Sequence, residues 1–172
     1  MRDFLRRLAD VQIGATYNFY RDGARAPLLR DRLARYLDER AGASILLVGE
    51  APGYRGARVS GIPLTSERLL TGLGPAEATA TIVHRVLAEL AIAGDVLLWN
   101  VVPTHPGTET SNRPPTRVEI EASRPFLDQL ARGRRVVAVG RIAEAVTGAP
   151  YVRHPSHGGA EAFRAGLVHL CS

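Results

Sequence analysis

The chain has 172 residues, of which 45% are hydrophobic and 23% are charged, and its formal net charge is +5. This length and apolar content exclude an intrinsically disordered chain and are sufficient for a single compact domain, residues 1–172. All 22 basic residues are arginine, which favours bidentate phosphate contacts, so the charge is compatible with a nucleic-acid partner. The single cysteine, Cys171, excludes an internal disulfide and any site held by several cysteines.

The N-terminal segment, residues 1–14, is amphipathic and interrupted by charges. It contains no apolar run long enough for a signal peptide or a membrane span. We therefore expect a soluble, cytoplasmic protein that does not enter a membrane, and we expect it to be a monomer.

Helices and buried strands are predicted to alternate along the chain. Apolar runs bounded by glycine or polar residues predict strands at 44–49, 95–100, 134–140 and 151–156. Helical spacing of apolar residues predicts helices at 26–40, 76–93, from Thr116 onward, at 141–148, and one or two turns within 159–167. The helix after Thr116 begins with a capping box to Glu119, and we expect Pro125 to interrupt and kink it.

This alternation predicts an α/β fold, a three-layer α/β/α sandwich around a central, mainly parallel four-stranded sheet. Ligands of such sheets bind outside the carboxyl ends of the strands. The glycine-rich and polar residues follow the strands: 49–53 after the first, Asn100 after the second, Gly140 after the third and 154–156 after the fourth. We expect them to meet at one edge of the sheet and to form a binding site.

The loop after the first strand, residues 49–67, differs from the common phosphate-binding loops. It lacks the lysine of a P-loop, and G-x-G-x-x-G does not occur in it. Glu50 would repel a phosphate at this position. The loop therefore favours a neutral ligand over an anion, with a purely structural turn as the alternative.

Three segments together resemble the uracil-DNA glycosylase superfamily, and most closely its family 4 enzymes. They are "GEAPGYRGARVSGIPLTSE", "LLWNVVPTHPGTETSNRPPTRVEI" and "VRHPSHGG", and the resemblance extends over residues 44–157. The resemblance implies an enzyme that extrudes a uracil nucleotide from single- or double-stranded DNA and hydrolyses its N-glycosidic bond. It implies base excision repair as the setting, DNA as the partner, and no metal or organic cofactor.

The resemblance also implies roles for individual residues. His154 would donate to the uracil oxygen beside the breaking bond, and Glu50 would hold the loop or place water. Asn100 can accept from N3–H and donate to O4 of uracil, whereas cytosine presents the reverse pattern. We expect the side chains of His154 and Asn100 to face each other across one small pocket.

The remaining candidates surround that pocket. The substrate-binding set is Gly49, Ala51, Pro52, Gly53, Tyr54, Leu64 and Asn100. Tyr54 would exclude the methyl group of thymine or pack on the surface, and Leu64 stands where the family commonly has a base-stacking aromatic ring. The expected DNA-binding residues are Arg113, Ser156 and His157.

The sequence departs from the family pattern in two respects. Family 4 enzymes hold an iron–sulfur cluster with four cysteines, which this chain lacks. The family also has an acid shortly after the Gly-Glu-Ala-Pro-Gly turn, where this chain has Gly56 and Ala57. Three alternatives therefore stay open: a glycosylase for another damaged base, a lesion-binding homologue with weak or no catalysis, and a protein that binds a free mononucleotide.

Overall fold

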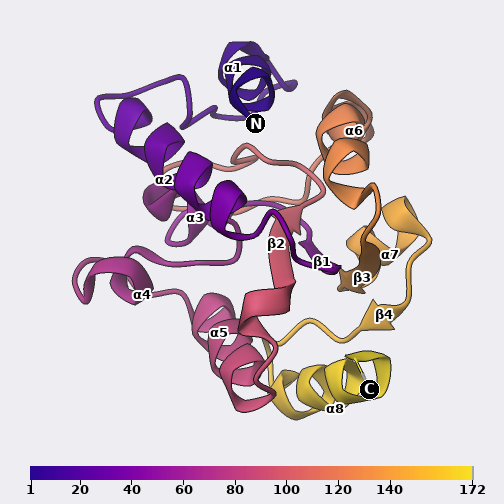
Figure 1. Ribbon diagram of the computed structural model, residues 1–172. Helices are drawn as coiled ribbons and strands as arrows, with labels where there is room; N and C mark the ends of the chain where they lie inside the picture. Colours follow the sequence, from indigo (N-terminus) through magenta and orange to yellow (C-terminus); the bar gives the residue numbers. More distant parts are fainter. Residues whose placement is uncertain (172) are drawn as a thin grey trace.

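The computed structural model describes residues 1–171, and its strands form one sheet with every pairing parallel (Figure 1). The strands are β1 (Ile45–Gly49), β2 (Val96–Asn100), β3 (Arg135–Val139) and β4 (Tyr151–Val152), in the order β2-β1-β3-β4. The predicted fold class, a four-stranded parallel sheet within an α/β fold, is thereby confirmed.

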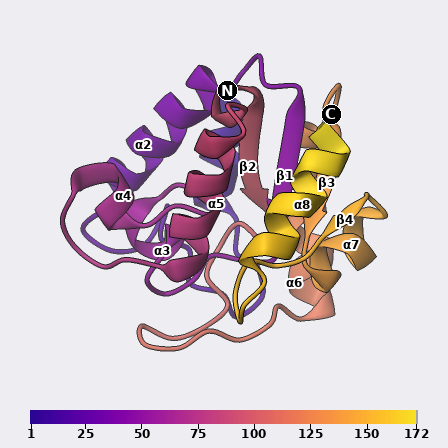
Figure 2. The same cartoon turned by 90° about the horizontal axis from the view of Figure 1, so that it is seen from below.

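Helices lie on both faces of this sheet: α5 and α8 on one, α1 and α6 on the other (Figures 1 and 2). The helical elements are α1 (Arg2–Asp10), α2 (Ala26–Glu39), α3 (Ala57–Ser60), α4 (Glu67–Thr71), α5 (Ala78–Glu89), the 3₁₀ turn η1 (Ala93–Asp95), α6 (Arg117–Ala131), α7 (Arg141–Thr147) and α8 (Ala160–Cys171). None of the helices within residues 1–171 is long and apolar enough to cross a bilayer.

The structure differs from the predicted elements at two prolines. The last strand, expected at 151–156, ends at Val152, whose carbonyl accepts from Gly140 N–H at 3.0 Å; Pro155, three residues later, has no N–H to extend the ladder. Pro125 does not interrupt α6, which is continuous from Arg117 to Ala131. Pro125 and the residue four positions before it are both exposed, so water can satisfy the carbonyl that loses its partner.

An aromatic cluster fixes the end of β2. Trp99, fully buried, packs edge-to-face on Phe4 of α1 with ring centroids 5.6 Å apart, and Phe4 packs in the same way on Phe126 of α6 at 5.5 Å. Each such pair stabilises the fold by about 0.5–1.5 kcal/mol beyond the area it buries. The residue after Trp99 is Asn100, so the cluster holds the backbone from which that candidate side chain projects.

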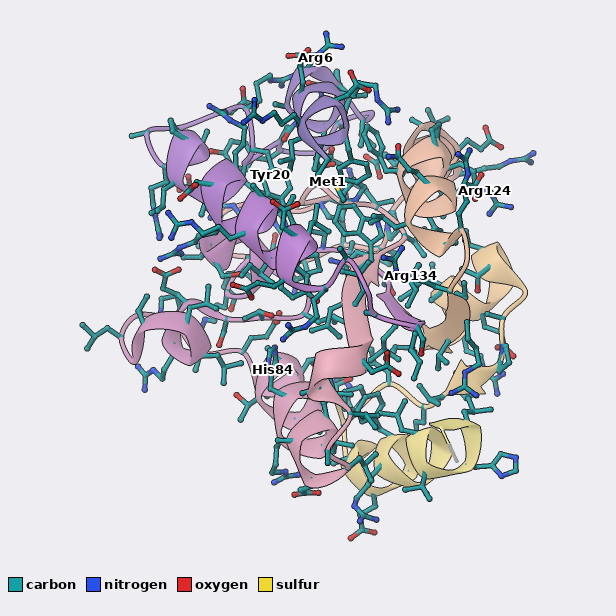
Figure 3. All side chains as sticks on the ribbon, in the orientation of Figure 1. Met1, Arg6, Tyr20, His84, Arg124 and Arg134 are labelled. Carbon is teal, nitrogen blue, oxygen red and sulfur yellow. The ribbon has the colours of Figure 1, made fainter. Side chains whose placement is uncertain are left out.

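Side chains also satisfy the outer edge and the amino end of the sheet. The Tyr36 hydroxyl of α2 accepts from Leu98 N–H on the edge strand β2 at 2.6 Å. The guanidinium of Arg134, labelled in Figure 3, donates to the carbonyls of Ala43, Leu130 and Ala41 at 2.8–3.0 Å. The loops that carry the candidate site are at the opposite, carboxyl end of the strands.

Candidate active site

A cavity of about 180 Å³ lies where the loops after β1, β2 and β4 meet. Seven of the residues predicted from the sequence line it: Glu50, Ala51, Pro52, Gly53, Leu64, Arg113 and His154. Five lining residues were not predicted for it: Ala57, Glu77, Thr79, Pro106 and Asn112. The structure thus brings together side chains from loops more than 100 residues apart in the chain.

The loop after β1 is held against the loop after β2. His105 is fully buried, and its ring lies between two carbonyl oxygens, with Nδ1 2.7 Å from Pro52 O and Nε2 2.8 Å from Thr108 O. The backbone N–H of Val102 donates to Glu50 O at 3.1 Å. These contacts fix the backbone that forms one wall of the cavity.

The hydrogen bonds of His154 determine which ring nitrogen carries its proton. Nδ1 is 3.2 Å from the backbone N of Ser156 and 2.7 Å from its hydroxyl. A backbone N–H can only donate, so Nδ1 accepts and the proton of the neutral ring is on Nε2. Burial, and then the proximity of His157, lower the pKa of His154 below 6.5, which favours the neutral ring. His154 therefore offers the cavity a positioned, uncharged N–H donor.

The Asn100 carboxamide is buried without a partner. Only 1% of the residue is exposed, and neither Oδ1 nor Nδ2 has a hydrogen-bond partner among the described residues. A Cβ on Gly49 would come within 2.9 Å of Asn100 Oδ1 and 3.0 Å of Leu64 Cδ2. Only glycine at position 49 leaves room for both side chains. Asn100 lies beside the lining residue Leu64 and outside the lining itself, so the structure does not place it directly across the cavity from His154.

Leu64 adopts a strained backbone conformation. It is buried and has φ = +51°, a left-handed geometry that costs a non-glycine residue roughly 1–2 kcal/mol. Its neighbour Thr65 holds it: Thr65 O accepts from the Ser60 hydroxyl at 2.7 Å, and Thr65 Oγ1 is 2.9 Å from His84 Nε2 on α5. In Figure 3 His84 lies on the side of α5 that faces α4.

Two carboxylates line the cavity, Glu50 and Glu77. Burial raises the pKa of both above the usual 4.5. The structure gives neither side chain a hydrogen-bond or ion-pair partner within the described residues. Glu77 was not anticipated from the sequence, where it lies 24 residues after Gly53, the last glycine of the Gly-Glu-Ala-Pro-Gly turn.

Arg113 is fixed at the cavity by a buried acid. It donates to both carboxylate oxygens of Glu119, at 2.6 and 2.8 Å, and Glu119 is 1% exposed. Glu119 also accepts from the Thr116 N–H while its own N–H donates to the Thr116 hydroxyl, so the predicted capping box is present. The hydrogen bonds from Arg113 are the main reason that the pKa of Glu119 is lowered to about 2. The guanidinium of Arg113 thus makes its hydrogen bonds mainly within the protein.

The other predicted residues lie outside the cavity lining. Tyr54 was expected in the pocket or on the surface; its ring packs against the Arg55 guanidinium, 5.4 Å from the ring centroid, and is not part of the lining. The Ser156 hydroxyl contacts the rings of both His154 and His157, the latter at 3.0 Å. Ser156 therefore orients His154.

The residues present do not fit an iron–sulfur cluster. The sequence has a single cysteine. Among the described residues there is also no group of three or more histidine, cysteine, aspartate or glutamate side chains arranged to hold a metal ion.

Three comparisons place the chain among known proteins. Residues 37–168 match the family model of the uracil DNA glycosylase superfamily. The type-4 uracil-DNA glycosylase of Pyrobaculum aerophilum is 32% identical over 103 residues, which are 58% of this chain and 45% of that protein; the match thus spans less than half of the relative's length. The crystal structure of wild-type Pedobacter heparinus SMUG2 has a TM-score of 0.67 over 98% of this chain and 95% of that one, at 13% identity, and shows a shared fold. Because the family match covers most of the sequence, including Asn100 at the end of β2 and His154 in the loop after β4, this chain belongs to the uracil DNA glycosylase superfamily.

Proposed function

We propose that this protein is a DNA glycosylase that hydrolyses the bond between C1′ of deoxyribose and N1 of uracil in DNA, initiating base excision repair. The observation that carries the proposal is the half-buried, neutral His154 ring, with its proton on Nε2, on the wall of a small cavity. The family membership and the type-4 uracil-DNA glycosylase relative support the same reaction. Extruding a nucleotide into such a cavity costs a few kcal/mol, and less for a mispaired base.

The chemistry requires a donor at the leaving base. As the glycosidic bond breaks, its electron pair moves to the base, and negative charge develops on the oxygen beside N1. The His154 Nε2–H donates to that oxygen. One positioned donor of this kind lowers the barrier by about 3–4 kcal/mol, since the interaction strengthens as charge develops. A neutral ring is suited to the role because it needs no counter-charge in a buried site.

Asn100 supports uracil as the base. Its Oδ1 can accept from N3–H while its Nδ2 donates to O4, and neither atom has a partner among residues 1–171. Cytosine would place an acceptor against Oδ1 and a donor against Nδ2, so it could pair with Asn100 only if the carboxamide turned by 180°. A base reaches Asn100 in this scheme when the neighbouring Leu64 side chain moves aside.

The test is release of uracil from a single-stranded oligonucleotide with one uracil, read as strand cleavage by alkali at the abasic site. We expect His154→Ala and Asn100→Ala each to slow single-turnover release by about 10²–10³-fold. The matched control is His169→Ala on the exposed side of α8, which should cleave like wild type. Equal rates in all three variants would refute the site.

A panel of oligonucleotides with other damaged bases separates the alternatives. Release of a different base, and not of uracil, would keep the reaction class and change the substrate. Tight binding to uracil-containing or abasic DNA with no release of any base would identify a lesion-binding protein instead.

A further inference from the structure

We propose that Glu77 is the catalytic carboxylate that binds and deprotonates the attacking water. The inference rests on the proposed function and adds a residue, Glu77, that none of the three family-like motif segments contains. Glu77 stands at the N-terminal cap of α5, and its side chain lines the same cavity as His154.

The Glu77 carboxylate occupies the space beside two glycines of the loop after β1. A Cβ built on Gly53 would overlap its Oε1, and a Cβ on Gly56 would overlap its Oε2. Gly56 and Ala57 are the positions at which this loop lacks an acid of its own. The glycines thus leave a gap in the wall of the cavity, and a carboxylate from α5 fills it.

The helix does not use this side chain as a cap. Glutamate is not among the favoured N-cap residues, and the Glu77 side chain makes no capping hydrogen bond. Its backbone is held instead: Glu77 O accepts from both the N–H and the hydroxyl of Thr81, each at 3.0 Å. The main chain is therefore fixed while the carboxylate, without a partner in the described residues, points to the cavity it lines.

Three other charged or titratable side chains line this cavity: Glu50, Arg113 and His154. Arg113 is paired with Glu119. His154 carries no charge as a neutral ring, in which Nδ1 accepts from Ser156 N–H and Nε2 holds the proton. Glu77 forms no ion pair with any of the described residues, so its charge is available to a substrate. Burial moves its pKa toward neutrality, the range in which a general base works best, and the helix N-terminus favours its ionised form.

The step balances as a hydrolysis. The C1′–N1 bond breaks and its electron pair leaves with the base, while the oxygen of one water forms a bond to C1′. One proton of that water passes to the Glu77 carboxylate, and from there to the uracil anion or to solvent. The products are uracil and an abasic deoxyribose with a hydroxyl at C1′. The same carboxylate faces the sugar as positive charge develops on it.

The decisive variant is Glu77→Gln, which keeps the shape and removes the charge. We expect single-turnover release of uracil to fall about 100-fold or more. We expect the affinity for the uracil oligonucleotide to change by less than about threefold, because the interaction acts in the transition state. The matched control is Glu89→Gln, at the other end of the same helix, where Glu89 forms surface ion pairs with Arg85 and Arg164. Its rate should equal that of wild type.

A second readout separates catalysis from folding. Glu77 is half-buried and has no ion pair among the described residues, so its ionised form costs stability. Glu77→Gln should therefore melt at the same temperature as wild type or higher near pH 7.5. The rate of uracil release by wild type should fall at low pH as Glu77 becomes protonated. This fall should be weakened or lost in Glu77→Gln. Glu77→Asp, which retains the charge but shortens its reach, should recover part of the rate.

Gly53→Ala tests whether the position of the Glu77 carboxylate matters, because Gly53 lies next to that carboxylate. Gly53 is outside the left-handed region, so alanine is allowed there, but its Cβ overlaps the mobile end of Glu77. We expect the substitution to displace the carboxylate and slow release. In a Glu77→Ala background, where the space is free, Gly53→Ala should have little further effect.

The outcomes decide between the two proposals. If wild type releases uracil and Glu77→Gln does so within about threefold of its rate, the Glu77 inference is wrong and the proposed function stands. A large loss in Glu50→Gln with none in Glu77→Gln would assign the water to Glu50. A marked drop in melting temperature in Glu77→Gln would show a structural role instead. No release by wild type would overturn the proposed function itself.

Discussion

Asn100→Leu should stabilise the protein while abolishing its recognition of uracil. Leucine has the same branching at Cγ as asparagine, so the substitution mainly removes two polar atoms. Oδ1 and Nδ2 are both buried and unpaired within the described residues, and each such group costs about 1–3 kcal/mol. Because a tetrahedral Cγ fits the contacts near Gly49 and Leu64 less well, some of this gain is offset by overpacking. We expect a net increase in the free energy of unfolding of about 1–3 kcal/mol.

The assay is equilibrium unfolding in urea together with thermal melting at neutral pH. For a chain of this length, a gain of about 2 kcal/mol corresponds to a rise in the melting temperature of roughly 4–8 °C. The matched control is Asn18→Leu. Asn18 is also 1% exposed, but its carboxamide bonds to Leu8 O at 2.8 Å, Val11 O at 3.0 Å and Tyr20 N at 3.1 Å. Its replacement should therefore destabilise the fold.

A loss of stability in Asn100→Leu comparable to that in Asn18→Leu would refute the reasoning. It would mean that ordered water satisfies the Asn100 carboxamide in the free protein, so that the side chain contributes to folding. An unchanged rate of uracil release in a stabilised Asn100→Leu variant would separately show that the carboxamide does not recognise the base.

Three further predictions concern the surroundings of the cavity. Glu119→Gln should lower the free energy of unfolding by about 2–3 kcal/mol at pH 7, because the pKa of Glu119 in the folded protein is about 2 against a usual 4.5. The difference in unfolding free energy between wild type and this variant, measured in urea, should shrink as pH falls from 4.5 toward 2. Gly49→Ala should abolish uracil release and lower the unfolding free energy by about 1–3 kcal/mol, because its Cβ crowds Asn100 and Leu64; Gly42→Ala, with open space around it, is the control. His157→Ala should raise the pKa of His154 measured by NMR titration, because the proximity of His157 is one of the two causes that lower it. Protonation of His154 favours the unfolded chain, so the free energy of unfolding of wild type should decrease as pH falls below 6.5.

The sheet could be predicted from the sequence because its strands are buried along their length. β1 and β2 are buried at every residue, so they appear as uninterrupted apolar runs between glycine and polar residues. The rule that ligands bind at the carboxyl ends of parallel strands then located the loops after β1, β2 and β4. The short helices α3 and α4 were not predicted, because four or five residues cannot nucleate a helix without tertiary contacts.

The orientation of side chains could be predicted less well than the location of the site. Tyr54 directly follows the glycine turn, yet its ring packs on Arg55, because two residues on one loop can stack on each other as readily as line a cavity. Asn100 is at the expected strand end, but Leu64 stands beside it in the cavity wall. Glu77 is brought to the loop by the packing of α5, and the only local sign of a special role is a glutamate where a helix would favour serine, threonine, aspartate or asparagine.

The unfavourable features of this cavity point to one physical requirement. In the part of the chain that the structure describes, the cavity and its wall include a carboxamide without a partner at Asn100, which lies behind Leu64, two carboxylates without an ion pair at Glu50 and Glu77, and left-handed backbone at Leu64. Each of these lowers stability, and the rest of the fold must hold them in place. A site that relaxed to satisfy these groups internally would have to break those bonds again before meeting a base. Keeping them unpaired but fixed means that a bound nucleotide supplies the missing partners, so the favourable interactions form with the substrate as it moves toward the transition state.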